Sequence, residues 1–274
     1  AVCLIAKRYD GVEKNTERYH EKICLNERCV AADGRYYGIT DKICVHENDA
    51  GQHYTAHVPG CVHTDLYSED EMFRDWNSEH CRWIEQHDWI YTREFTLTPE
   101  DISEEAGIPE LLFEGLDTYC EIRLNDVLVG TAENMFIPHR FCAKGRLRAG
   151  VNTLCVRFHS PLRAVADKPL RSGAFTTERL YTRRLQCSYG WDWVDRFVTC
   201  GIYRPVRLLW HNASELEHVS IVTEHLDAWG AQLKITAQLR HDHASGTQIL
   251  MQILSPGGAV VYENRCFSAE ELAV

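Results

Sequence analysis

The stretch Cys120–Gly130, CEIRLNDVLVG, carries the clearest structural signal in the chain. Ile122 and Leu124 alternate with charged residues, which is the period of two expected of a strand with one buried face. Asn125 and Asp126 come next, and this pair suits a tight hairpin turn because both residues tolerate a positive φ. A second apolar run follows at once. The stretch therefore predicts a β-hairpin.

The same alternation recurs on both sides of this hairpin. In Ala149–Pro161, for example, Leu154, Val156 and Phe158 are predicted to share one face of a strand. Pro205 is expected at an edge or bulge of a further strand because proline cannot donate to a sheet. Helical periodicity is found only in two short segments. Together these patterns predict an all-β sandwich, with strands at Asp88–Pro99, Ala149–Pro161 and Gly201–Trp210 and helices at Ser78–Gln86 and Asp101–Ala106.

The pattern changes after Trp210, where four further strands are predicted, with a hairpin turn at Ser255–Gly258. An immunoglobulin-like sandwich needs about 100 residues, and only about 60 remain. The sequence thus predicts a first domain over residues 1–212. It predicts a partial immunoglobulin-like β-sandwich over residues 213–274, and hence a fragment of a longer protein.

Composition narrows the range of partners. The 274 residues carry a formal net charge of −11, which disfavours binding to nucleic acid. No apolar stretch is long enough to span a membrane. The 12 cysteines are scattered, without a Cys-x-x-Cys motif, and are expected to be mostly free thiols in a reducing compartment. With no signal-peptide pattern at the start, we expect a cytoplasmic protein.

The sequence offers little to a metal or cofactor. His241–His243, HDH, contains two imidazoles, whereas a zinc site takes three or four ligands, so a solvated turn is expected. No clustered aspartates and asparagines call for calcium. Phosphate-binding glycine loops and the usual hydrolase motifs are missing from the sequence. We therefore expect no cofactor and no metal.

One aromatic stretch, Gln186–Arg196 (QCSYGWDWVDR), points to a ligand. An indole offers a flat face to the C–H face of a pyranose and loses little rotamer entropy on binding. A carboxylate beside it can accept hydrogen bonds from two sugar hydroxyls. Trp191 and Asp192 are thus a candidate sugar clamp, with Gly190 permitting the turn. The alternative is that Trp191 and Trp193 fill the core and Asp192 caps a turn.

Several motifs in a fixed order resemble the N-terminal sugar-binding domain of glycoside hydrolase family 2, in its β-mannosidase branch. The resemblance runs from about Val58 to Leu208, and the Trp-Asp-Trp element points to that branch. It implies a jelly-roll (galactose-binding-like) β-sandwich, then an immunoglobulin-like domain, then a (β/α)₈ barrel with two catalytic glutamates. The motifs are Val58–Leu66, Trp83–Phe95, Leu111–Gly130, Glu133–Phe141, Gly150–Pro161, Arg183–Arg196 and Gly201–Leu208.

The resemblance also implies roles for the aromatic stretch. In β-mannosidases the corresponding tryptophan and aspartate reach into the active site of the barrel and contact the terminal mannose. Carried over, Trp191 lines the subsite and Asp192 binds ring hydroxyls, while Trp193 is expected to pack the loop down.

Basic residues are expected to support this loop. Arg183 and Arg184 match an Arg-Lys pair of the family, and two interpretations stay open for them. They form salt bridges to Asp192 or Asp195, or they are solvated. Arg196 is retained, but Val194-Asp195 stands where the family commonly has Gly-Pro, so the exit of the loop is expected to differ.

Three carboxylates elsewhere invite a catalytic interpretation, because a retaining glycosidase needs two carboxyl groups about 5–5.5 Å apart. Glu114, Asp117 and Glu121 lie on or beside predicted strands. The family places its acid/base and nucleophile in the barrel, so a structural role is favoured, with Asp117 fixing a turn. No catalytic residue is expected in this chain.

These observations predict the N-terminal part of a β-mannosidase-like enzyme that hydrolyses terminal β-mannosides with retention. The piece is expected to be inactive alone, to contact carbohydrate, and to dock on the catalytic barrel of the same parent chain. Two alternatives stay open. One is a stand-alone carbohydrate-binding module, and the other is a family 2 glycosidase for a different β-glycoside.

Overall fold

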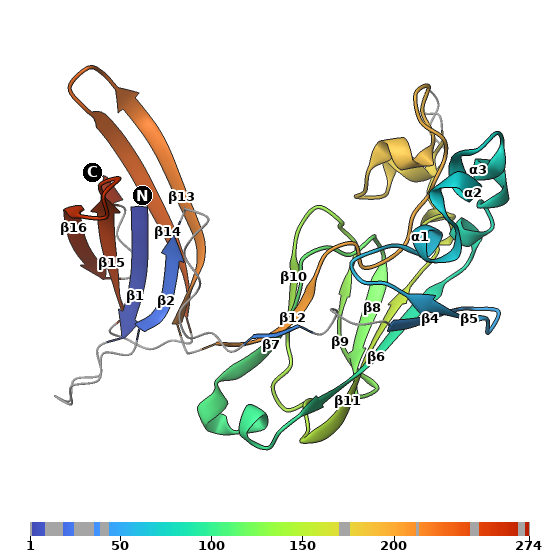
Figure 1. Cartoon of the computed structure of the whole chain (residues 1–274), viewed down its shortest axis with the longest axis horizontal. Coiled ribbons are helices and arrows are strands. Elements are labelled where there is room, and N and C mark those ends of the chain that lie inside the picture. The colour runs from blue at the N-terminus through green and yellow to red at the C-terminus, as the bar shows by residue number, and fades with distance from the viewer. Residues whose placement is uncertain are drawn as a thin grey trace. The chain divides into compact units, whose positions relative to one another are not determined.

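The computed structural model describes residues 2–8, 19–24, 36–38, 44–169, 176–211, 214–241, 247–267 and 272–273. The chain forms two compact units (Figure 1). One unit spans Tyr36–Leu209, and the other combines Ala1–Arg35 with Trp210–Val274. Both are built mainly from strands, which confirms the predicted all-β class.

The unit 36–209 is made of two sheets with buried apolar side chains on each, as in a sandwich. The larger sheet has the strand order β5-β4-β6-β11-β8-β9, and the smaller has the order β10-β7-β12-β3. The strands are β3 (Tyr36–Gly38), β4 (Cys44–Asn48), β5 (His53–Ala56), β6 (Trp89–Leu97), β7 (Ile108–Phe113), β8 (Cys120–Leu124), β9 (Val127–Ala132), β10 (His139–Cys142), β11 (Gly150–Phe158) and β12 (Val206–His211).

The predicted hairpin at residues 120–130 is confirmed as β8 and β9. Asn125 and Asp126 form its turn with φ angles of 50° and 66°, the left-handed region that such turns require. Ile122 and Leu124 are fully buried. The Asn125 amide also donates to Asn152 Oδ1 at 2.8 Å, which ties the turn to β11.

The central pair of the larger sheet is β6 with β11, in register from Trp89 opposite Phe158 to Leu97 opposite Gly150. Its alternation follows the prediction, with Leu154, Val156 and Phe158 all buried. The strand predicted at Gly201–Trp210 is confirmed only in part, because β12 begins at Val206. Pro205 lies just before this strand, and β12 is an inner strand of its sheet, so the expected edge or bulge position of the proline is wrong.

The helices differ more from the prediction. Two helices missed in the sequence are α1 (Val62–Leu66) and α2 (Glu69–Phe73). Ser68 caps α2, with its Oγ accepting from the Glu71 backbone N–H at 3.3 Å, so an S-x-x-E capping box was available as a signal. The two predicted helical segments contain only single turns. These are α3 (Asn77–His80), η1 (Ile84–Gln86), η2 (Glu100–Ile102) and η3 (Glu104–Ala106). In the described part of the chain, no helix is both long and apolar enough to cross a membrane.

In the second unit, one sheet has the order β16-β15-β1-β2 and the other β13-β14-β17, and β13 contacts both β1 and β2. The four strands predicted after Trp210 are confirmed as β13 to β16. The strands are β1 (Val2–Arg8), β2 (Tyr19–Cys24), β13 (Ser214–Leu226), β14 (Ala231–His241), β15 (Thr247–Leu254), β16 (Val260–Phe267) and β17 (Leu272–Ala273).

The predicted domain boundaries are wrong for the start of the chain. Residues 1–212 were expected to form one domain, but β1 pairs with β15, with Val2 opposite Ile253. Residues 1–35 therefore belong to the unit that contains 210–274. Local alternation predicts a strand without naming its partner, so a pairing between the two ends of the chain left no local signal.

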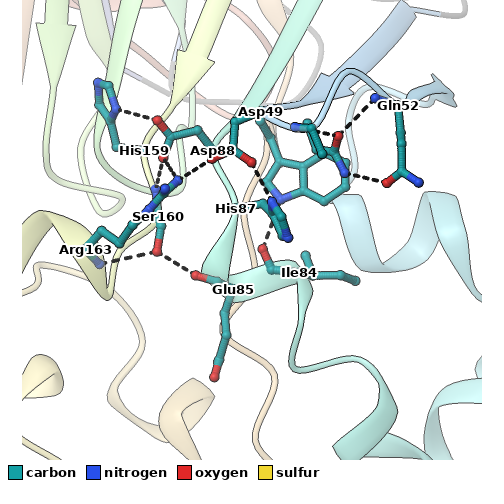
Figure 2. Close-up of polar contacts among 12 residues, drawn as sticks. Asp49, Gln52, Ile84, Glu85, His87, Asp88, His159, Ser160 and Arg163 are labelled. Carbon is teal, nitrogen blue, oxygen red and sulfur yellow. Dashed lines mark hydrogen bonds and ion pairs between the residues drawn. The ribbon is translucent and has the colours of Figure 1, made fainter.

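A polar cluster joins the start of β6 to the end of β11, and Figure 2 shows its hydrogen bonds. The buried Asp88 accepts from the Ser160 backbone N–H at 2.8 Å and from Arg163 Nη2 at 2.7 Å. Arg157 and His159 Nδ1 contact its other oxygen at 3.1 and 3.2 Å. Burial raises the pKa of Asp88, but these hydrogen bonds and the charge of Arg163 outweigh burial and lower it.

The same cluster holds the one-turn helix η1. Ser160 Oγ donates to the Glu85 carbonyl at 2.6 Å, and the indole N–H of the buried Trp89 donates to the Ile84 carbonyl at 3.0 Å. Arg163 also reaches Asp49 Oδ2 at 2.7 Å. Partial burial raises the pKa of Asp49, but the hydrogen bonds from His87 and Arg163 outweigh it and lower the pKa to about 2. The cluster thus fixes the backbone that carries the Glu85 carboxylate.

Removing the centre of this cluster should destabilise the unit 36–209. Asp88→Ala leaves the Ser160 N–H and Arg163 without this acceptor, and we expect a loss of about 2 kcal/mol in the free energy of unfolding. Because the folded pKa of Asp88 is lowered, its contribution is present above about pH 4 and is lost as the pH falls further. Urea unfolding at pH 7 measures the loss. The exposed Asp70→Ala is the control, and equal effects of the two variants would contradict the expectation.

Candidate functional site

The Trp-Asp-Trp stretch forms a tight turn. The single-turn helix η6 (Gln186–Tyr189) ends at Gly190, whose φ of 91° favours glycine. The Trp191 backbone N–H then donates to the Val194 carbonyl at 3.1 Å, which leaves Asp192 at the tip. Val194, which stands at the first position of the family's Gly-Pro, therefore supplies the carbonyl that closes this turn.

Both indoles lie on the surface of the unit. Trp193 is 73% exposed and Trp191 is 39% exposed, and Asp192 is exposed between them. The alternative in which both tryptophans fill the core is therefore wrong. The expectation that Trp193 packs the loop down is also wrong, because its ring contact is with Trp191, at 5.4 Å between centroids and a 53° tilt.

Arg179, which the sequence analysis did not single out, lies under the turn. It belongs to the single-turn helix η5 (Glu178–Leu180) and is only 4% exposed. Its Cζ lies 4.5 Å from the centroid of the Trp191 ring, within the range of a cation–π contact. Its Nη2 also donates to the Gln186 carbonyl at 2.7 Å. A charged residue in a segment without periodicity gave no reason to expect burial.

Arg196 anchors the exit of the turn. Its Nε lies 3.1 Å from both carboxylate oxygens of Glu85, and its Nη1 donates to the Tyr189 carbonyl at 3.4 Å. Both side chains of the ion pair are mostly buried. Glu85 is the second residue that the sequence analysis missed, because it lies 111 residues before Arg196. The polar cluster around Asp88 holds its backbone, so the turn rests on a rigid base.

Arg184 fits neither of the two interpretations, because it is buried rather than solvated and its ion pair is with Asp117 rather than with a carboxylate of the turn. Its side chain is 1% exposed and pairs with Asp117, which is 4% exposed, at 3.0 Å between Nη2 and Oδ2. Thr199 Oγ1 donates to the same oxygen at 2.6 Å. Asp117 also exchanges backbone hydrogen bonds with Gly201, so it fixes two segments together. Arg183 has an exposed side chain, and its backbone carbonyl accepts a hydrogen bond from the Met135 backbone N–H at 3.0 Å.

The other two carboxylates also have basic partners. Glu114 pairs with Arg207 at 2.5 Å, and Glu121 lies 3.5 Å from Arg123. A separate cation beside each carboxylate is consistent with the structural role favoured from the sequence.

Aromatic contacts continue beyond the exit of the turn. Phe197 makes edge contacts with His63 of α1 and with Phe73 of α2, at 5.7 and 5.2 Å between centroids. Phe73 itself is largely exposed, as is Trp76 just before α3. Burial, reinforced by the charge of Arg184, lowers the pKa of His63 to about 4. Exposed apolar side chains thus lie both on the turn and on neighbouring helices.

The possible metal and cysteine sites have less support in the structure than the turn has. No three His, Cys, Asp or Glu side chains gather as a metal site requires within the described residues. In the HDH stretch, Asp242 and His243 lie outside those residues. The seven cysteines whose side chains are described are free thiols, and burial raises the pKa of the Cys120 and Cys200 thiols.

Comparison with known proteins identifies the family of this chain. The family described as "Glycosyl hydrolase 2 galactose-binding domain-like" matches residues 44–204, which is more than half of the chain. The mouse β-mannosidase is 29% identical over 248 residues, covering 82% of this chain and 27% of the relative. The goat β-mannosidase is 30% identical over 210 residues, covering 69% of this chain and 23% of the relative.

Comparison with solved structures agrees with this family match. The crystal structure of the β-D-mannosidase from Dictyoglomus thermophilum matches with a TM-score of 0.75 and 30% identity, covering 88% of this chain and 30% of that one. The β-D-glucuronidase of the same organism matches with a TM-score of 0.59 at 14% identity, over 86% of this chain and 37% of that one, and shows the shared fold alone. The chain spans less than a third of the length of each β-mannosidase described here. It belongs to the glycosyl hydrolase 2 galactose-binding domain-like family, and it matches the N-terminal region of β-mannosidases.

Proposed function

We propose that this chain is the N-terminal part of a retaining glycosidase that removes terminal β-mannosides. The observation that carries the proposal is the exposed Asp192 carboxylate, presented between two surface indoles on a turn that buried arginines hold in place. The names of the matched relatives support mannose as the sugar.

The geometry suits contact with a sugar ring. A carboxylate at the tip of a turn can accept hydrogen bonds from two neighbouring hydroxyls, and charge-assisted bonds of this kind are stronger than neutral ones. The open indole of Trp193 offers an apolar surface to the C–H face of the ring. Because the turn is already ordered, little further entropy is lost when a ligand binds.

The chemistry itself is proposed to lie elsewhere in the parent protein. Retention requires a nucleophile and an acid/base carboxyl on opposite sides of the glycosidic bond. In this chain Glu114, Asp117 and Glu121 are beside basic side chains, which is the arrangement of structural carboxylates. The chain alone is therefore proposed to be inactive, while it shapes the subsite of the whole enzyme.

The exposed apolar side chains near the turn are proposed to face the catalytic part of the parent. Trp193 on the turn and Phe73 and Trp76 by α2 and α3 are all largely exposed. Large apolar groups gathered on a surface commonly mark an interface. A subsite assembled from two domains requires such a contact, since Asp192 must reach a sugar held by the catalytic domain.

The test uses the full-length parent protein and a chromogenic β-mannoside. Asp192→Ala should lower kcat/KM by about 30-fold or more, which corresponds to about 2 kcal/mol of lost transition-state stabilisation. Asp195→Ala is the matched control, because Asp195 is an exposed carboxylate three residues along the same loop. The 274-residue chain alone should show no hydrolysis.

Other outcomes would separate the alternatives. A parent that cleaves a β-glucoside or β-glucuronide faster than the β-mannoside would show a different substrate. Equal activity of Asp192→Ala and Asp195→Ala would show that the turn does not contact the substrate, and it would overturn the role proposed here.

A further inference from the structure

We propose that Arg179 is the positioning residue of the Trp-Asp-Trp turn: it holds one face of Trp191 and thereby sets the orientation in which Asp192 and Trp193 are presented. The inference rests on the proposed function for its effect on catalysis. Its structural content can be tested on this chain without any sugar.

Arg179 is almost completely buried. A guanidinium that is only 4% exposed loses most of its hydration and needs compensating contacts. Two of its contacts go to the loop, namely the Gln186 carbonyl at 2.7 Å and the Trp191 ring at 4.5 Å. The cation therefore links the helical turn before Gly190 to the first indole after it.

The planar shape of the arginine side chain suits both contacts. A planar guanidinium can donate in its own plane and stack over an aromatic ring with its face, whereas an ammonium is a compact point charge. With Arg179 on one face, the rotation of the Trp191 indole is restricted. Trp193 meets that indole at 5.4 Å and a 53° tilt, so the orientation of the more exposed ring follows from the first.

The turn has two anchors, Arg179 and Arg196. Arg196 holds the exit of the turn through Glu85, and the Trp191–Val194 hydrogen bond closes it. Arg179 contacts the entry side, at Gln186 and Trp191. Replacing Arg179 should therefore release the orientation of Trp191 while the exit of the turn stays attached to the rest of the unit.

The measurement is the exciton signal of the paired indoles in circular dichroism, recorded on the 274-residue chain. Trp83 and Trp89 form another pair, 5.7 Å apart, so the contribution of the turn is defined as the difference between wild type and Trp193→Phe. Arg179→Met should remove at least half of that difference. Arg179→Lys should do the same, because it keeps the charge but not the planar group.

The matched control is Arg183→Met, which removes an exposed arginine next to the same loop and should leave the signal unchanged. The strand signal in the far ultraviolet and the thermal midpoint show whether each variant is folded. An unchanged exciton signal in folded Arg179→Met or Arg179→Lys would overturn the inference. If neither variant folds, Arg179 is a residue required for folding and the inference is wrong.

The effect on catalysis is measured in the full-length parent with the chromogenic β-mannoside. Arg179→Met should lower kcat/KM by about tenfold, and Arg179→Lys should not restore it, in contrast to a role of charge alone. If Asp192→Ala impairs the parent while Arg179→Met leaves both the exciton signal and kcat/KM unchanged, only this inference fails. Arg179→Met can also remove the exciton signal while both Asp192→Ala and Arg179→Met leave kcat/KM unchanged. In that case the proposed function fails and the positioning role stands.

Discussion

Arg184→Met should lower the free energy of unfolding of the unit 36–209 by about 3–5 kcal/mol, because it leaves a buried carboxylate without its cation. The pair is almost completely buried, with Arg184 1% and Asp117 4% exposed at an N–O distance of 3.0 Å. Thr199 and Thr118 also donate to Asp117, but neutral hydroxyls do not replace a charge. Urea unfolding at pH 7, followed by tryptophan fluorescence, measures the change.

The double variant Arg184→Met/Asp117→Asn is the informative control for this prediction. Because it removes both charges, it should recover part of the stability lost in the single variant. The exposed pair of Arg74 and Asp70, 3.9 Å apart, supplies the surface comparison, and Arg74→Met should cost less than about 1 kcal/mol. If Arg184→Met is no more destabilising than Arg74→Met, the buried pair does not contribute as argued.

Acid should destabilise the same unit through His63. Burial and the charge of Arg184 lower the folded pKa of His63 from 6.5 to about 4. Between these values the unfolded chain binds the proton more readily, so stability falls as the pH falls from about 6.5 to about 4. The difference, 6.5 minus 4, corresponds to about 3 kcal/mol at about 1.4 kcal/mol per pH unit.

The measurement is the free energy of unfolding at several pH values in this window, for wild type and His63→Leu. The variant cannot titrate at this position, so its stability should depend less on pH, while all other groups contribute to both proteins. His80→Leu, which replaces an exposed histidine in α3, should behave as wild type. Parallel curves for wild type and His63→Leu would contradict the prediction.

Much of the fold could be predicted because its signals are local. Alternation in Leu154, Val156 and Phe158 indicates a strand with one buried face, and the structure buries all three. Asn125 and Asp126 indicate a turn because few residues accept a positive φ, and both adopt it. Such patterns depend on a residue and its immediate neighbours, so they can be seen without knowing what packs against them.

The candidate site was only partly predictable for the same reason. Trp191 and Asp192 stand out by residue type and by their place in a run of family motifs. Arg179 and Glu85 do not, because what matters about them is burial beside the turn. The expected partners of Arg184 were carboxylates close in sequence, whereas its partner Asp117 lies 67 residues earlier. Coulomb attraction acts through space and pairs whichever charges the fold brings together.

The sequence by itself determined the all-β class, the hairpin at residues 120–130 and the position of an aromatic, acidic turn after Gly190. Only the tertiary structure decided that β1 pairs with β15, that Arg179 and Arg196 hold the turn, and that Trp193 is the more open indole. The physical reason is the range of each effect. Backbone preference and side-chain alternation act over a few residues, whereas sheet pairing, burial and ion pairing depend on segments that meet only when the chain is folded.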